Sequence, residues 1–206
     1  MFFQFESSLF QSILSWIVSN QIEIFAALTG GIYLMYSVLE NKLLWVFGAI
    51  SSALYIYIYH HAKIYADMGL YVYYVLVSIY GWFHWLYGSN ANSKQLPIVK
   101  LKTKQWLIVF MVIAALLSLV YFILNTFTDS DIAFWDALTT SSSIVATWML
   151  ARKILGHWLI WIVVDIISMI LYVYKGLYPT VVLFLLYTVF AVIGYIKWKK
   201  NLQVQA

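Results

Sequence analysis

The stretch WLIWIVVD, Trp158 to Asp165, decides how this chain folds. It begins an apolar run over 158–174 that is interrupted by Asp165 and Ser168 and is close to the roughly 20 residues that a membrane-spanning helix needs. On a helix of about 3.6 residues per turn, the aromatic and polar side chains fall on one face. That face carries Trp158, Trp161, Asp165, Ser168 and Tyr172. The opposite face is Leu, Ile and Val, which suits lipid or neighbouring helices.

Asp165 is the residue that indicates a function for this face. A carboxylate at mid-membrane depth costs about 2.5–3.5 kcal/mol on insertion scales, so it should face the interior of the bundle or a wet cavity. Two indoles and an acid on one face predict a seat for a flat cationic ring, held by stacking, cation–π attraction and a charge-assisted hydrogen bond. The alternative is a carboxylic acid that hydrogen-bonds a neighbouring helix, with the Trp residues as packing.

The whole composition agrees with a membrane protein. Of the 206 residues, 64% are hydrophobic and 10% are charged, and the mean hydropathy is +0.86. A soluble domain of this size cannot hide so much apolar surface. Long apolar runs indicate helices rather than the alternating strands of a β-barrel. Cysteine is absent and the four His residues are scattered, so we expect no metal site and no cofactor, and the net charge of +4 gives no indication of nucleic-acid binding.

Seven membrane-spanning helices are predicted, at about 22–39, 43–59, 68–87, 106–124, 132–150, 158–174 and 179–196. The N-terminal segment mixes Phe and Leu with Gln, Glu and Ser, which predicts a short amphipathic helix at the membrane interface, or a short extra span. The expected parts are an N-terminal interfacial helix (1–20), a first three-helix bundle (22–87), a loop with a spacer helix (88–131), a second three-helix bundle (132–198) and a cytoplasmic tail (199–206).

The basic residues predict the orientation. Ten of the twelve Lys and Arg residues fall on one side of a seven-span topology, and only Lys63 and Lys175 fall on the other. The positive-inside rule makes the first side cytoplasmic, with the N-terminus outside and the C-terminus inside.

The sequence matches itself when it is shifted so that Trp45 aligns with Trp158. The other pairs that match at this repeat offset are Tyr59 and Tyr172, Tyr65 and Tyr178, Tyr74 and Tyr187, Gly81 and Gly194, and Trp85 and Trp198. Because one helix lies between them, two such three-helix units cross the membrane in the same orientation, which predicts a parallel 3+1+3 repeat. In this arrangement we expect a site between the two bundles and transport by alternating access.

The repeat adds residues of the first bundle to the predicted site. On the second helix these residues are Trp45, Ser52 and Tyr55, and on the third they are Tyr71, Tyr74 and Ser78. Ser52 stands where the second bundle has Asp165, so the charge belongs to one repeat only. Gly48 is expected to be a close-packing point, and Trp82 and Trp85 are expected to anchor the third helix at the membrane interface.

Three groups of motifs resemble the Pnu family of bacterial vitamin transporters. They are Trp158-x-x-Trp161-x-x-x-Asp165 after Ala151-Arg152-Lys153; Tyr65-Ala66-Asp67 followed by Tyr80-Gly81-Trp82; and Tyr174-Lys175-Gly176-Leu177-Tyr178 with Gly194-Tyr195 and Trp198. The resemblance covers about 23–198. It implies a full-length SWEET-like 3+1+3 fold in the bacterial inner membrane, and contact of Trp158, Trp161 and Asp165 with the substrate.

The resemblance also implies uptake by facilitated diffusion, a homotrimer, and a cytoplasmic kinase that traps the vitamin by phosphorylation. Family members carry nicotinamide riboside, thiamine, riboflavin or deoxynucleosides. Nicotinamide riboside carriers resemble one another in having Asn before the Arg, where this chain has Ala151. The resemblance therefore favours thiamine, with nicotinamide riboside as the alternative, and both carry a cationic aromatic ring.

Other membrane functions are less consistent with the sequence. A retinal protein needs a Lys in its last helix, and 181–196 contains none. An intramembrane enzyme needs a nucleophile with a base, or a metal motif, and neither is found. A channel repeats its polar lining by symmetry, whereas here the charge lies in one repeat. A carrier that couples transport to protonation of Asp165 stays open as a rival mechanism.

Overall fold

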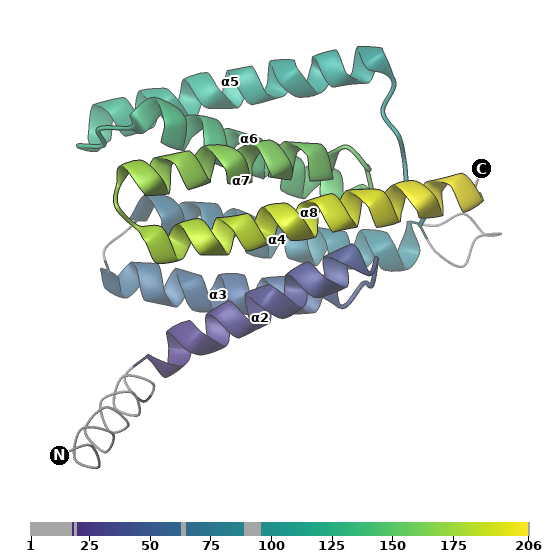
Figure 1. Cartoon of the computed structure of the whole chain (residues 1–206), viewed down its shortest axis with the longest axis horizontal. Coiled ribbons are helices and arrows are strands. Elements are labelled where there is room, and N and C mark those ends of the chain that lie inside the picture. The colour runs from purple at the N-terminus through teal and green to yellow at the C-terminus, as the bar shows by residue number, and fades with distance from the viewer. Residues whose placement is uncertain (1–17, 19, 63–64, 89–95, 206) are drawn as a thin grey trace.

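The computed structural model describes residues 18, 20–62, 65–88 and 96–205. Within these ranges the chain forms seven helices, labelled α2 to α8 in Figure 1. They are α2 (Gln21–Val38), α3 (Leu44–Ala62), α4 (Tyr65–Tyr87), α5 (Thr103–Phe127), α6 (Ala133–Ala151), α7 (His157–Tyr174) and α8 (Tyr178–Gln205). Six of them begin and end within three residues of the predicted ranges. The amphipathic helix predicted for 1–20 falls almost entirely outside the described residues.

Four helices are both long enough and apolar enough to cross a membrane by composition, namely α2, α5, α7 and most of α8. Helices α3, α4 and α6 have 19 to 23 residues, which is also sufficient for a span of about 20 residues. Their Tyr, Ser and Thr residues make them less apolar. These are the side chains expected on helices that line the interior of a membrane bundle.

Successive helices run in opposite directions (Figure 1). Helices α2, α4, α6 and α8 end, and α3, α5 and α7 begin, at the right of this view, which we call the Lys153 end. The left is called the Lys175 end. Helix α5 packs along α6 at the edge of the bundle and has no buried residue.

The remaining six helices form two halves with matching contacts. In the first half α3 packs against α2 and α4, and in the second half α7 packs against α6 and α8. The halves meet where α4 contacts α6 and where α2 contacts α8. Since α2 and α6 are the first helices of their halves and α4 and α8 the last, the two contacts between the halves are equivalent.

In each half, near the Lys153 end, a tryptophan ring packs directly against a glycine of a neighbouring helix. A Cβ atom added to Gly81 would lie 2.4 Å from the Trp45 ring, and one added to Gly194 would lie 2.5 Å from the Trp158 ring. Only glycine allows the helices to approach so closely. Both Trp rings are almost fully buried.

Ring contacts recur at the repeat offset found in the sequence. They join Trp45 with Trp85 and Trp158 with Trp198, at 5.7 and 5.8 Å between centroids; Tyr59 with Tyr71 and Tyr172 with Phe184, at 5.3 and 5.1 Å; and Tyr71 with Tyr74 and Phe184 with Tyr187, at 5.4 and 5.6 Å. The match therefore extends from the sequence to the geometry of packing.

Two expectations at the Lys153 end were wrong. Trp85 is buried rather than placed at the membrane interface, because it packs on Trp45 and its indole N–H donates to the carbonyl of Ala151 at 3.0 Å. Helix α8 does not end near Ile196 but continues to Gln205. The extended part of the helix packs against the first half, because Trp198 is fully buried and donates to the carbonyl of Ser37 at 3.1 Å, and Asn201 donates to Glu40.

A short backbone pairing fixes the connection before α5. The N–H of Val99 donates to the carbonyl of Lys153, and the N–H of Leu155 donates to the carbonyl of Val99, both at 2.9 Å. Leu96 and Ile98 are buried beside it. The pairing holds the α6–α7 connection, and with it the start of the polar face on α7.

Candidate functional site

The polar face predicted on α7 is the buried face of that helix. Trp158, Asp165 and Ser168 are buried, and Trp161 and Tyr172 are half-buried. On the opposite face Val163 and Ile170 are exposed by 54% and 63%. The predicted division of α7 into an inner polar face and an outer apolar face is confirmed.

Asp165 is buried without a partner. Its exposure is 4%, and within the described ranges no hydrogen bond or ion pair to its carboxylate is found. The alternative of a carboxylic acid hydrogen-bonded to a neighbouring helix is therefore not what the described residues form. Tyr187 of α8 lies within electrostatic range of Asp165 and also of Tyr55 from the first half, which places Asp165 near the contact between the halves.

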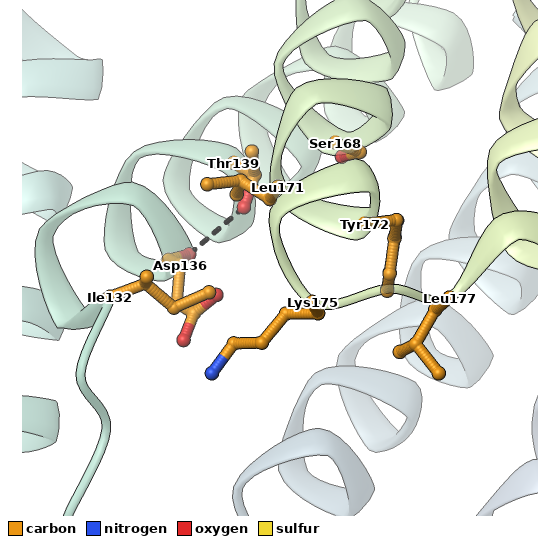
Figure 2. A pocket seen from close by; sticks show the side chains of 8 residues that line it. All are labelled: Ile132, Asp136, Thr139, Ser168, Leu171, Tyr172, Lys175 and Leu177. Carbon is orange, nitrogen blue, oxygen red and sulfur yellow. Dashed lines mark hydrogen bonds between the residues drawn. The ribbon is translucent and has the colours of Figure 1, made fainter.

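A cavity of about 230 Å³ opens at the Lys175 end of this face. Figure 2 shows its lining of Ile132, Asp136, Thr139, Ser168, Leu171, Tyr172, Lys175 and Leu177. Ser168 and Tyr172 belong to the predicted set. Ser168 lies about one helical turn from Asp165 on the same face, so the cavity lining and the buried acid are neighbours on α7, although Asp165 itself does not line the cavity.

Three of the predicted tyrosines come together in the first half. The ring of Tyr71 lies 4.9 Å from that of Tyr55 and 5.4 Å from that of Tyr74, centroid to centroid. Tyr59 joins them, with its hydroxyl interacting with that of Tyr71. Tyr73, whose ring lies 5.8 Å from that of Tyr74, donates its hydroxyl to the Ile144 carbonyl of α6 at 2.8 Å, so this tyrosine cluster reaches across to the second half.

Four other predicted residues lie apart from the cavity lining. Trp45 and Trp158 are packed on their glycines toward the Lys153 end. Ser52 and Ser78 are buried, and Ser78 borders Gly48, where an added Cβ would lie 3.3 Å from its hydroxyl oxygen. The structure thus separates the predicted set into residues beside the cavity and residues in the packed core.

Sequence reasoning missed three polar residues of the lining, Asp136, Thr139 and Lys175. Asp136 begins a polar stripe on α6 that continues through Thr140 and Ser143, and this spacing could have identified it. In Figure 2 the Asp136 carboxylate and the Lys175 amine point toward each other across the cavity mouth. Ser130 also donates to Asp136, at 2.9 Å.

The mouth of the cavity carries charge outside the helices. Lys175 donates to Asp131 at 2.5 Å, and both side chains are exposed. This hydrogen bond lowers the pKa of Asp131 and raises the pKa of Lys175. Lys175 therefore lies between two carboxylates, those of Asp131 and Asp136, at the mouth of the cavity.

The residues that the structure describes contain no group of three or more His, Asp or Glu side chains that could hold a metal ion. The chemistry available to the cavity is therefore that of hydroxyls, aromatic rings and carboxylates. Groups of these kinds are suited to a polar aromatic molecule or a cation.

A membrane bundle of helices with a buried acid that has no partner among the described residues, and with a cavity on the same helical face, is typical of transporters of small molecules as a class. A sequence model of the nicotinamide mononucleotide transporter family matches residues 20–200. The chain belongs to this family of membrane transporters. The resemblance to Pnu proteins predicted from the motifs is thereby confirmed.

Curated relatives and one solved structure agree. The chain is 25% identical over 209 residues to the nicotinamide riboside transporter PnuC of Escherichia coli K12, covering 90% of this chain and 85% of the relative. It is 27% identical over 197 residues to PnuC of Neisseria mucosa, covering 90% and 73%. The crystal structure of the vitamin B3 transporter PnuC has the same fold, with a TM-score of 0.75 and 24% identity over 97% of this chain and 89% of the other.

Proposed function

We propose that this protein carries nicotinamide riboside across the membrane. The observation that carries the proposal is Asp165, a buried carboxylate without a partner among the described residues, on the same helical face as Trp161 and as Ser168 of the cavity lining. The positive pyridinium ring would lie against Trp161 and near Asp165, and the ribose hydroxyls would meet Ser168, Tyr172 and Thr139.

The comparisons favour nicotinamide riboside over thiamine, reversing the order that the sequence suggested. The relatives quoted above are named as nicotinamide riboside transporters. The preference for thiamine depended on Ala151, which is fully buried at the Lys153 end and accepts the indole hydrogen bond of Trp85. A residue in that position does not reach the cavity lining, so its identity is a weak guide to the substrate.

The transport path proposed here runs between the two halves of a parallel 3+1+3 arrangement. The recurrence of ring contacts and Trp–Gly contacts at the repeat offset supports this arrangement, with α5 as the helix between the halves. The cavity of about 230 Å³ is smaller than the roughly 300–1,000 Å³ of typical ligand pockets. It would be the outer part of the site, and a rocking motion of the halves would complete it.

The orientation proposed places the Lys153 end in the cytoplasm. Arg152, Lys199 and Lys200 belong to this end, where basic residues are favoured. The cavity at the Lys175 end would then face outward and take up the vitamin, and a cytoplasmic kinase would retain it. The site residues Trp45, Ser52, Ser78 and Trp158 would act from the packed core, by holding the cavity residues in place.

The mechanism proposed is facilitated diffusion, because Asp165 has no second buried acid or His beside it, among the described residues, to relay a proton. Uptake of radiolabelled nicotinamide riboside and thiamine into proteoliposomes tests both substrate and mechanism. We expect saturable uptake of nicotinamide riboside that stops at equal concentrations, with weaker uptake of thiamine. Accumulation against the gradient under an imposed pH difference would contradict facilitated diffusion, and uptake of thiamine alone would contradict the substrate.

A further inference from the structure

The Lys153 end holds a buried ion pair between the halves. The Lys153 amine lies 3.1 Å from a carboxylate oxygen of Glu40, and the two side chains are 2% and 7% exposed. Glu40 follows α2 in the first half, and Lys153 follows α6 in the second. Asn201 of α8 donates to the other oxygen of Glu40 at 2.5 Å. Both carboxylate oxygens are therefore bound by the opposite half.

Glu40 and Lys153 occupy equivalent places in the two halves. They are separated by the repeat offset, and they are the only non-glycine residues with positive φ in the described part of the chain, at 55° and 51°. This left-handed conformation is uncommon for such residues. The two helix ends thus present an acid and a base, on matching backbones, toward each other.

Two tryptophans bridge the same contact in reciprocal fashion. Trp85 of the first half donates to the Ala151 carbonyl of the second, at 3.0 Å. Trp198 of the second half donates to the Ser37 carbonyl of the first, at 3.1 Å. The Lys153 amine also lies 4.7 Å from the centroid of the Trp85 ring. These bonds join both places where the halves meet, α4 with α6 and α2 with α8.

The opposite end has no comparable bond in the described residues. Its ion pair, Lys175 with Asp131, is exposed and joins two connections that flank α6 and α7, so it does not cross to the first half. The cavity also lies at that end. That cavity is lined by residues of the second half alone, and in the middle of α4 and α6 the Tyr73 hydroxyl donates to the Ile144 carbonyl at 2.8 Å. Among the described residues, the buried ion pair and the indole hydrogen bonds between the halves therefore lie at the Lys153 end, and the cavity opens at the Lys175 end.

We propose that Glu40, Lys153 and Asn201, with the indoles of Trp85 and Trp198, form a gate that closes the transport path at the Lys153 end. This inference rests on the alternating access proposed above. A buried ion pair suits a reversible gate, because the attraction between its charges is offset by the loss of their hydration. When the halves part, water solvates both charges and the two indoles, so the open state is not heavily disfavoured.

The chain contains no cysteine, so single-cysteine reporters of access need no background substitutions. Ser37→Cys reports the Lys153 end, where Ser37 is 2% exposed, and Thr139→Cys reports the cavity. The rate of labelling by N-ethylmaleimide is measured for each reporter in the purified protein, without substrate, with and without Glu40→Gln. Lys42→Gln, an exposed charge in the same connection, is the matched control.

We expect Glu40→Gln to raise labelling of Ser37→Cys by about tenfold, the equilibrium equivalent of one hydrogen bond to a charged group. Labelling of Thr139→Cys should fall in the same background, and Lys42→Gln should change neither. The exchange of charges, Glu40→Lys with Lys153→Glu, should restore slow labelling of Ser37→Cys. The double variant keeps an ion pair between the same two positions, so restored slow labelling would distinguish the loss of the gate from a general loss of stability.

Unchanged labelling of Ser37→Cys in folded Glu40→Gln would overturn the gate, and so would a rise at both reporters together, which indicates a loosened fold. Labelling needs no vitamin, so it is independent of the proposed substrate. If the reporters respond in opposite directions while the wild type transports no nicotinamide riboside, the gate stands and the substrate is wrong.

Discussion

The two halves of the protein have the same packing but different polar chemistry. In each half, one tryptophan ring packs against a glycine and a second tryptophan packs against the first. Where the second half has Trp161 and Asp165, the first half has Gly48 and Ser52. The recurring contacts support a repeated scaffold, on which Trp161 and Asp165 of the second half are proposed to supply the stacking surface and the charge.

The difference between Gly48 and Trp161 is compensated on the neighbouring helix. A Cβ added to Gly48 would lie 2.9 Å from the ring of Tyr33 on α2. The residue equivalent to Tyr33 on α6 is Ala146, which is fully buried in the cluster against which Trp161 packs. The first half thus has a large residue, Tyr33, on its first helix and a small one, Gly48, on its second helix. In the second half the small residue, Ala146, is on the first helix and the large one, Trp161, is on the second. The expected close packing at Gly48 is confirmed, and this exchange of sizes gives Trp161 its space.

The largest expected effect tests whether the scaffold is shared. Gly81→Ala and Gly194→Ala each force a methyl group to within 2.6 Å of a Trp ring, and overpacking of this kind costs about 1–3 kcal/mol or more. We expect both variants to lower Tm by similar amounts in detergent. Gly69→Ala is the control on α4, because nothing lies within 4 Å of its added Cβ. A large decrease in Tm for only one of the two variants would show that the Trp–Gly contacts of the two halves are not equivalent.

The next effect tests the chemistry that the halves do not share. Trp161→Ala removes the proposed stacking surface, and loss of stacking on one ring weakens binding by about 1–3 kcal/mol. Titration of nicotinamide riboside followed by intrinsic fluorescence or calorimetry measures it. Trp148→Ala, at an exposed Trp of α6, is expected to leave affinity unchanged. Equal affinity in folded Trp161→Ala would exclude stacking.

A smaller effect compares equivalent tyrosines. Tyr172 lines the cavity, whereas Tyr59 packs against Tyr55 and Tyr71 in the tyrosine cluster of the first half. Tyr172→Phe should weaken binding of nicotinamide riboside by about 0.5–1.5 kcal/mol, the net contribution of one hydrogen bond. Tyr59→Phe should bind as the wild type does. The reverse result would move the ribose site to the first half.

The smallest effect concerns the exposed pair at the cavity mouth. Lys175 lowers the pKa of Asp131, so any stability from the pair is present above the usual carboxylate pKa and is lost as pH falls through the lowered pKa of Asp131. Because both side chains are exposed, Lys175→Met should not change Tm measurably at pH 7 or at acid pH. A clear decrease at pH 7 alone would show that the pair joins structural elements.

The sequence predicted the helices and the buried face of α7 because both depend on periodic patterns of apolar residues. It did not predict the burial of Trp85 and Trp198, since a Trp near a membrane edge has the same pattern whether it anchors the helix or packs inside. Lys153 after a helix had the pattern of a topology determinant, and only its spatial contact with Glu40 showed an ion pair.

Asp136 illustrates the same limit at the site. An acid in the first turn of a helix is favoured by the helix dipole, so Asp136 alone gave no separate signal of a cavity, and only its spacing with Thr140 and Ser143 could have indicated one. Its place in the lining depends on how α6 packs against α7, and the periodicity of a single helix does not predict how it packs against another helix. The two members of the predicted set that line the cavity, Ser168 and Tyr172, are those that share a helical face with Asp165.

Asp165 is proposed to hold a cationic ring, and one binding measurement tests this central role most directly. Nicotinamide riboside, which is charged, and nicotinamide, its neutral ring, are titrated into the wild type and into Asp165→Asn. Loss of one hydrogen bond to a charged group predicts nicotinamide riboside binding about tenfold or more weaker in the variant, with little change for nicotinamide. Unchanged binding of nicotinamide riboside by folded Asp165→Asn would contradict this role.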